Sequence, residues 1–162
     1  MTFIWMKQAL TSAEVILPDV DSRWVAMHFV AFRFLIGTIS TLVILRASRS
    51  GFNDPEVWKG GFSLGLILIL GFLIQMVGLT DVTPAVSAFL TSLYVVFTAI
   101  MGVALGRQRM TSFMIFGVLL ATFGAGWISG PPRVEFGVGE WLTVVSGFLF
   151  AMHIIVTDKV TR

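Results

Sequence analysis

Cysteine is absent from this chain, and charged residues make up only 12% of it. The missing cysteines exclude disulfides and thiolate metal sites, although they do not identify the compartment. A soluble domain typically carries about 25% charged residues. Here 56% of the residues are hydrophobic, and the mean hydropathy is +0.91. This composition favours a protein embedded in a lipid bilayer.

The basic residues do not form a patch. The net charge of +2 and the pI near 9.5 would suit a nucleic-acid partner, but lysines and arginines are dispersed between apolar runs. A nucleic-acid-binding surface needs basic side chains gathered on one face. We therefore expect no nucleic-acid partner, and we expect the lipid bilayer as the surroundings of most of the chain.

Five apolar runs are long enough to cross a bilayer, which takes about 20 mostly apolar residues in a helix. The runs do not alternate with a period of two, as the strands of a membrane barrel do. They cover residues 24–45, 61–79, 84–105, 111–129 and about 138–156. The sequence therefore predicts an all-α integral membrane protein, built as a helical bundle with five full spanning helices.

A shorter apolar segment, TFIWMKQAL at 2–10, precedes these runs. It is roughly half as long as a spanning helix needs to be, and Lys7 and Gln8 lie in it before a polar stretch at 11–23. This order predicts the outer end of a truncated first helix, whose beginning is missing. The alternative is a naturally short N-terminus that lies at the membrane surface or crosses only partly.

The uneven distribution of basic residues orients the predicted spans. If the runs alternate in direction, seven basic residues fall on one side, namely Arg46, Arg49, Lys59, Arg107, Arg109, Lys159 and Arg162. Most of the acidic residues fall on the other side. Cytoplasmic loops of membrane proteins carry the excess of Lys and Arg. We therefore expect a multi-pass protein of the cell's inner or plasma membrane, with a cytoplasmic C-terminus.

Polar residues form stripes on two of the predicted spans. In the span at 84–105, an arc of about 60° holds four hydroxyl-bearing residues, Ser87, Thr91, Tyr94 and Thr98. In the last span, an arc of about 80° holds Thr143, Ser146, His153 and Thr157. Each stripe should face protein or a water-filled cavity, because polar groups avoid lipid.

Two interpretations of these stripes stay open. Small hydroxyl residues let helices pack closely, and we favour this interpretation for Ser87 and Thr98. The rings of Tyr94 and His153 need both room and a partner, which favours a cavity lined from both helices. If a wet cavity is present, cysteines at Thr91, Tyr94 and His153 should react with a water-soluble reagent, and cysteines at Val95 and Ile154 should react much less.

Single polar residues on two other spans leave a similar choice. Arg33 lies near the middle of its span, where a charge is costly. It either faces a cavity or a partner, or it extends along the helix to the membrane surface. Gln75 is the only amide within a predicted span, and it either binds a solute or bonds to a neighbouring helix.

Glycines recur at a spacing of four, which is typical of helices in close contact. The G-x-x-x-G pairs are Gly61/Gly65, Gly102/Gly106 and Gly126/Gly130. In a chain with 16 glycines, they predict ordinary packing inside one bundle rather than a dimer interface.

Features of an enzyme are missing. No acidic residue lies in the middle of a predicted span, since Asp81, Glu140 and Asp158 all lie at the ends. This argues against a buried carboxylate that carries protons. The H-E-x-x-H pattern of zinc hydrolases is absent, and no serine with an oriented base stands out. We expect no enzyme activity, no metal and no cofactor.

The segment at 72–130, which reads FLIQMVGLTDVTPAVSAFLTSLYVVFTAIMGVALGRQRMTSFMIFGVLLATFGAGWISG, resembles the EamA-type permeases of the drug/metabolite transporter superfamily. Those proteins share a Gln followed by Gly-Leu, a threonine-containing turn, Phe-Leu-Thr, a long apolar helix, a short charged turn and a glycine-rich helix. FRFLIG at 32–37 is similar to the arginine-phenylalanine pair of their second helix. The segment at 2–10 is similar to the end of their first helix.

This resemblance implies ten helices, arranged as two inverted five-helix repeats around a central cavity. Residues 1–130 would then form the first repeat with an incomplete first helix, and residues 131–162 would begin the second repeat with one helix. The turn LGRQRM at 105–110 lacks the acidic residue that the family often carries there, so no role of that acid is transferred.

The function predicted from these features is transport of small organic metabolites or drugs by alternating access, with this sequence as a partial chain. The candidate cavity-lining residues are Gln75, Thr91, Tyr94 and His153. A homodimer is expected if the chain functions as it stands. The alternative is a non-transporting membrane protein or truncated remnant that acts only through helix–helix association.

Overall fold

The computed structural model describes residues 2–16, 18–44, 54–106, 109, 111–129 and 137–161, and no strand occurs among them. The regular elements are all helices: α1 Thr2–Ile16, α2 Ser22–Ile44, α3 Pro55–Asp81, α4 Pro84–Ser92, α5 Tyr94–Ala104, α6 Ser112–Ser129 and α7 Val138–Val160. The all-helical prediction is thus confirmed for the described part of the chain.

Two of these helices, α3 and α4, begin with a side-chain cap followed by a proline. Asp54 accepts a hydrogen bond from the Glu56 backbone N–H at 2.9 Å, ahead of Pro55 at the first position of α3. Thr83 does the same for Val86 at 3.3 Å, ahead of Pro84 in α4. Such caps satisfy backbone donors that a helix start leaves without partners, and proline there loses nothing.

Four of the five predicted spans are confirmed as apolar helices long enough to cross a membrane. They are Ser22–Ile44, Pro55–Asp81, the combined stretch Pro84–Ala104 and Val138–Val160, with mean hydropathies between 1.6 and 2.4. The run predicted at 111–129 does form a helix, α6. Of that helix, however, Ser112–Gly124 counts only as a shorter apolar segment. The described residues therefore contain four candidate spans, and the fifth span stays a prediction.

The first helix differs from the prediction. We expected a helix that ends near Lys7 and Gln8, but α1 continues to Ile16. No proline or glycine interrupts residues 2–16, and Thr11 donates a hydrogen bond to the Lys7 carbonyl within the helix, at 3.0 Å. Proline cannot continue a helix, and Pro18 follows soon after its end. Part of the polar stretch at 11–23 is therefore helical.

α1 is held against the rest of the bundle by one charged residue, Lys7, and two apolar residues, Met6 and Leu10. The Lys7 ammonium donates to the carbonyls of Leu79 and Thr80, at 2.8 and 2.7 Å. These carbonyls lie in the last turn of α3, where a helix lacks internal partners and favours a cation. Met6 and Leu10 are buried in the same core cluster as residues of α2 and α3.

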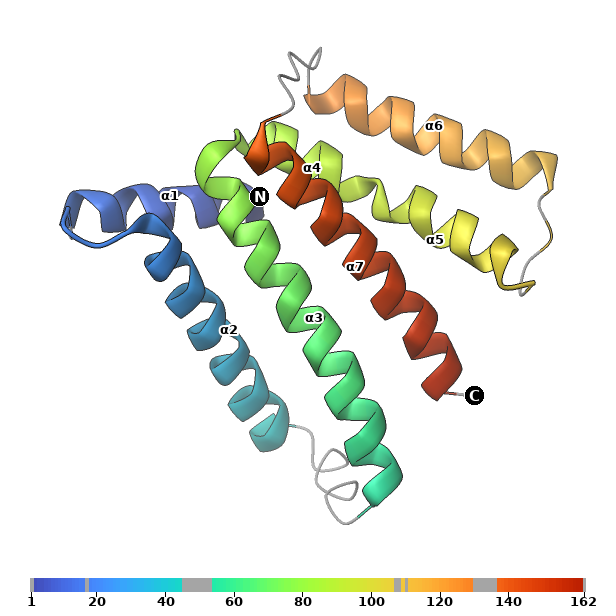
Figure 1. The fold of residues 1–162 in the computed structure, drawn as a ribbon, viewed down its shortest axis with the longest axis horizontal. Helices are drawn as coiled ribbons and strands as arrows, with labels where there is room; N and C mark the ends of the chain where they lie inside the picture. The colour runs from blue at the N-terminus through green and yellow to red at the C-terminus, as the bar shows by residue number, and fades with distance from the viewer. Residues whose placement is uncertain are drawn as a thin grey trace.

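The run predicted as one helix at 84–105 is divided at Leu93. The Ser92 hydroxyl donates to the Phe89 carbonyl at 2.6 Å, and the Leu93 N–H bonds to Leu90 at 3.3 Å instead of to Phe89. A serine that bonds back to its own helix competes with the backbone and bends the helix. The helical hydrogen-bond pattern is therefore interrupted at Leu93, which keeps right-handed helical backbone angles, and α5 continues onward from α4 (Figure 1).

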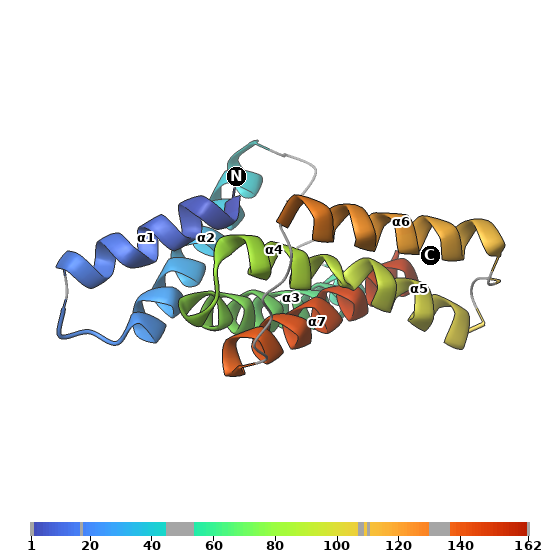
Figure 2. The ribbon, with the colours of Figure 1, turned by 90° about the horizontal axis from the view of Figure 1, so that it is seen from above.

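The most extensive helix contact joins α3 and α7, which lie side by side in both views (Figures 1 and 2). Glycines make it possible. A Cβ atom on Gly78 would lie 2.9 Å from the Gly139 carbonyl oxygen, and one on Gly71 would lie 2.8 Å from the Phe150 ring. Absent side chains thus let the two backbones approach closely, as in other membrane bundles.

Three glycines of the G-x-x-x-G pairs, Gly61, Gly65 and Gly106, do not make such contacts, so the packing prediction is wrong for them. A Cβ on Gly61 or Gly65 would meet nothing within 4 Å, and neither would one on Gly106, which has a positive φ of 66°. Gly102 is buried. The surroundings of Gly126 are not among the described features, and Gly130 lies outside the described residues.

The helices from α2 onward alternate in direction, with α4 and α5 counted as one span (Figure 1). The start of α3 lies against the end of α7, since a Cβ on Gly60 would be 2.6 Å from Val160 Cγ1. Lys59 and Lys159 therefore lie at the same end of the bundle, as the charge distribution predicts. Arg46, Arg49, Arg107 and Arg162 lie outside the described residues.

Candidate functional site

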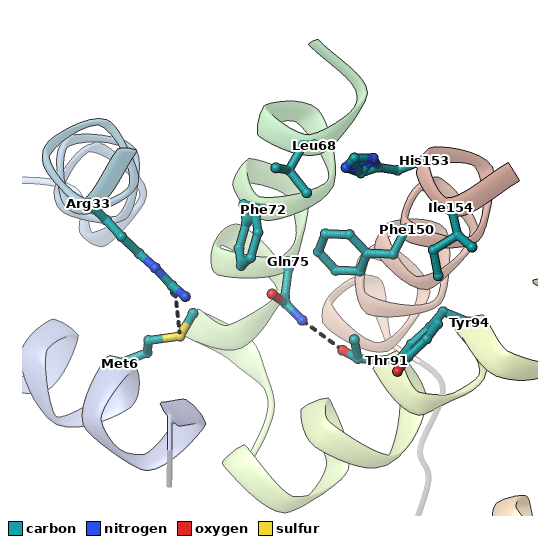
Figure 3. Close-up of a pocket in the computed structure, with 10 residues that line it drawn as sticks. All are labelled: Met6, Arg33, Leu68, Phe72, Gln75, Thr91, Tyr94, Phe150, His153 and Ile154. Carbon is teal, nitrogen blue, oxygen red and sulfur yellow. Dashed lines mark hydrogen bonds between the residues drawn. The ribbon is translucent and has the colours of Figure 1, made fainter. Parts of the chain in front are cut away.

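A cavity of about 440 Å³ opens between α1, α2, α3, the α4–α5 break and α7 (Figure 3). Its lining comprises Met6, Arg33, Leu68, Phe72, Gln75, Thr91, Tyr94, Phe150, His153 and Ile154. All four candidate residues chosen from the sequence are in this set. Their grouping is a feature of the fold, and their role in binding a solute stays a prediction.

Gln75 and Thr91 form a hydrogen-bonded pair across two helices. The Gln75 amide nitrogen on α3 donates to the Thr91 hydroxyl on α4 at 2.9 Å. Both residues are buried, with 3% and 8% of their surfaces exposed. Of the two alternatives for Gln75, the bond to a neighbouring helix is present, and it joins α3 to α4 two residues before the chain breaks at Leu93.

Tyr94 and His153 approach the cavity from different helices. Tyr94 is the first residue of α5, so the break at Leu93 sets the direction of its ring. His153 lies on α7, and Figure 3 shows its ring extending toward Leu68 of α3. The Nδ1 atom of His153 is 3.4 Å from the Thr157 hydroxyl, which itself donates to the His153 carbonyl at 2.8 Å.

Much of the two polar stripes serves packing, as favoured for the small residues. Thr143 and Ser146 are fully buried and donate to carbonyls of their own helix, Gly139 and Thr143, at 2.9 and 2.7 Å. Ser87 is also fully buried, and its hydroxyl has no partner among the described residues. Only the Thr91–Tyr94 and His153 portions of the stripes reach the cavity.

Arg33 lines the cavity, although the residue as a whole is exposed. Its guanidinium carbon lies 4.9 Å from the centre of the Phe72 ring on α3, and its Nη1 atom is 3.7 Å from the Met6 sulfur on α1. Figure 3 shows the side chain extending from α2 toward Met6. Of the two alternatives for this residue, the structure therefore has the cavity-facing one.

The apolar part of the lining was missed from the sequence, although a signal was present. Leu68 and Phe72 precede Gln75 by seven and three residues, and Phe150 precedes His153 by three, so each lies on the face of its polar neighbour. The low reactivity expected at Ile154 does not fit its position, because this residue also lines the cavity. The side chain at 154 is adjacent to that of His153 at the open edge, where 42% of its surface is exposed.

The cavity offers hydrogen-bonding and apolar groups rather than metal ligands. Across the described ranges, no three His, Asp or Glu side chains gather closely enough to hold a metal ion. The lining contains one histidine, one amide, two hydroxyls and one arginine. Such a site can orient a small organic molecule inside an apolar pocket.

Comparisons with known proteins bear on what such a cavity does. A model of the EamA-like transporter family matches residues 2–130. An uncharacterized transporter of Archaeoglobus fulgidus is 30% identical over 105 residues, which cover 65% of this chain and 33% of that protein. The matched segment thus spans about a third of the relative's length. No solved structure matches the chain. Because the family match extends over most of its length, the chain belongs to the EamA-like transporter family.

Proposed function

We propose that this protein moves small organic metabolites or drugs across the cell's inner or plasma membrane, through the cavity between α1, α2, α3, α4–α5 and α7. The observation that carries this proposal is the convergence of Gln75, Thr91, Tyr94 and His153 on one cavity. Polar groups on spanning helices are costly in lipid and usually mark a solute pathway. Membership of a transporter family and the transporter relative support the same function.

The helix break supports alternating access as the mechanism. Transporters often bind their solutes where a spanning helix is discontinuous, because irregular backbone is tolerated only beside a cavity or inside protein. Here the break at Leu93 separates Thr91 from Tyr94, and both line the cavity. We propose that a bound solute contacts both sides of the break, so that α4 and α5 reorient when the cavity opens to the other side.

The repeat arrangement is a further part of the proposal. Residues 1–130 would form one five-helix repeat, and residues 131–162 would begin a second. The close α3–α7 contact at Gly78 and Gly139 would then join the two repeats, and motion between them would occur at this crossing. In this orientation the end that carries Lys59 and Lys159 is cytoplasmic.

Uptake into vesicles tests the function. The purified protein is inserted into lipid vesicles, and the entry of labelled small organic anions, zwitterions and cations is compared with entry into empty vesicles. We expect uptake of at least one class, and its loss in Thr91→Trp, which fills the cavity. Thr38→Trp on the exposed face of α2 is the matched control and should transport normally.

The alternative is a protein that acts only through helix association. It predicts that no solute of any class enters above the level of empty vesicles. A measurable flux that is faster than entry into empty vesicles would exclude it.

A further inference from the structure

The guanidinium of Arg33 lacks a partner that matches its charge. Arginine carries five N–H donors and keeps its charge in proteins. Its two contacts are the Met6 sulfur and the Phe72 ring. A thioether is only a weak acceptor, and an aromatic ring attracts a cation without satisfying several donors. Among the residues that the structure describes, no carboxylate forms an ion pair with Arg33.

The position of Arg33 makes this imbalance costly. The residue lies near the middle of α2, a helix long and apolar enough to span a membrane. Charges at that depth are usually paired, face water or bind a charged ligand. None of the residues that line the cavity is acidic, and Arg33 is the only one of them with a permanent charge. A bound anion would supply the missing opposite charge.

The rest of the cavity fits an apolar body attached to that anion. Phe72 lies against Arg33 on one side, and its ring centre is 5.1 Å from that of Phe150 on the other, edge to face. Leu68 and Ile154 extend this apolar surface. The volume of about 440 Å³ is within the range for small-molecule sites.

We infer that the cavity binds small organic monoanions with an aromatic or apolar body, and that Arg33 pairs with the anionic group. The planar fork of a guanidinium can bond two oxygens of a carboxylate or sulfonate at once. The flat body would then lie along Phe72 and Phe150, with the Tyr94 hydroxyl near its other end. This inference names the solute class and rests on the proposed function only for transport, because binding can be measured alone.

A matched pair of ligands tests the inference. Benzenesulfonate and benzenesulfonamide have nearly the same shape, but only the first is an anion at neutral pH. Equilibrium dialysis with the purified protein should give about ten- to hundredfold tighter binding of the anion, since hydrogen bonds between charged groups contribute about that much. Arg33→Met should remove this preference, and Arg33→Lys should keep part of it.

Arg23→Met is the matched control, because Arg23 is also an exposed arginine on α2 but lies outside the cavity lining. It should bind benzenesulfonate as tightly as the unchanged protein. If Arg33→Met does not fold, the ligand pair on the unchanged protein and Arg33→Lys decide the matter. Equal binding of both ligands, or benzenesulfonate binding that Arg33→Lys and Arg33→Met leave unchanged, would overturn the inference.

Vesicle uptake of benzenesulfonate and of the cation benzyltrimethylammonium separates this inference from the proposed function. Anion binding that depends on Arg33, with no uptake of either probe, would support the anion site and contradict transport. Uptake of the cation, with no Arg33-dependent anion binding, would support transport and overturn the anion site.

Discussion

Replacing Gly78 with alanine should weaken the contact between α3 and α7. The new Cβ atom would lie 2.8 Å from the Thr143 hydroxyl and 2.9 Å from the Gly139 carbonyl oxygen. The hydroxyl can rotate away, but the carbonyl belongs to the backbone of α7. To reach ordinary contact distance, the two helices must separate by roughly half an ångström. Overpacking of this kind costs about 1–3 kcal/mol.

The matched control lies on the same helix. Gly65→Ala adds the same methyl group to α3 where nothing lies within 4 Å. It should be neutral or stabilising, because alanine favours a helix over glycine by about 1 kcal/mol. Both variants gain the same helix propensity, so thermal unfolding in detergent should place Gly78→Ala about 2–12 °C below Gly65→Ala, with Gly65→Ala at or above the unchanged protein.

A double variant identifies which atom matters. Thr143→Ala removes the hydroxyl but leaves the Gly139 carbonyl in place, so it should not restore the stability of Gly78→Ala. Equal melting temperatures for Gly78→Ala and Gly65→Ala would refute the proposed close contact of α3 and α7. Full recovery in the double variant would show that the side chain, and not the backbone, limits the approach.

Three other predictions concern the Lys7 contact, the orientation in the membrane and the water content of the cavity. Lys7→Met should destabilise the protein by about 1–2 kcal/mol, because the last carbonyls of α3 lose their donor, whereas Lys7→Arg should unfold near the normal temperature; an unchanged melting temperature for Lys7→Met would contradict this role. Cysteine at Glu14 should react with an impermeant thiol reagent in intact cells and cysteine at Lys159 should not, and the reverse pattern would invert the orientation. Cysteine at Tyr94 or His153 should react with a water-soluble reagent while cysteine at the fully buried Ser146 stays inert, and equal inertness would argue for a dry cavity.

The positions of the spans and of the polar cavity residues could be predicted because both depend on local pattern. Length and hydropathy place α2, α3, α4–α5 and α7, and the 3.6-residue period brings Thr91 and Tyr94 onto one face. The same period relates Phe72 to Gln75, so the apolar lining was within reach of sequence reasoning.

The break at Leu93 could not be predicted in this way. No proline or glycine marks it. It depends on the hydrogen bond that the Ser92 hydroxyl donates to the Phe89 carbonyl. The glycines that pack were also hidden, because Gly78 and Gly139 are distant in sequence and meet only when α3 and α7 are neighbours. The spacing of four that marks Gly61 and Gly65 says nothing about which helix lies opposite.

The continuation of α1 past Lys7 could not be predicted either, because it depends on contacts that the local sequence does not show. The sequence shows a polar stretch there, and polarity suggested that the helix had ended. The Thr11 hydroxyl instead bonds within the helix, while Lys7 bonds to the end of α3. The partner that lets a lysine stay in a helix near the membrane lies more than 70 residues away along the chain.

Reversible blocking of the cavity tests most directly whether solute passes through it. The chain contains no cysteine, so a single cysteine at Thr91 is the only target for a methanethiosulfonate reagent. Uptake into vesicles should be measurable before treatment, fall after the reagent is attached, and return to its starting rate when a reductant removes it, while the cysteine-free protein should transport throughout. Undiminished uptake by the fully labelled variant would contradict passage through this cavity.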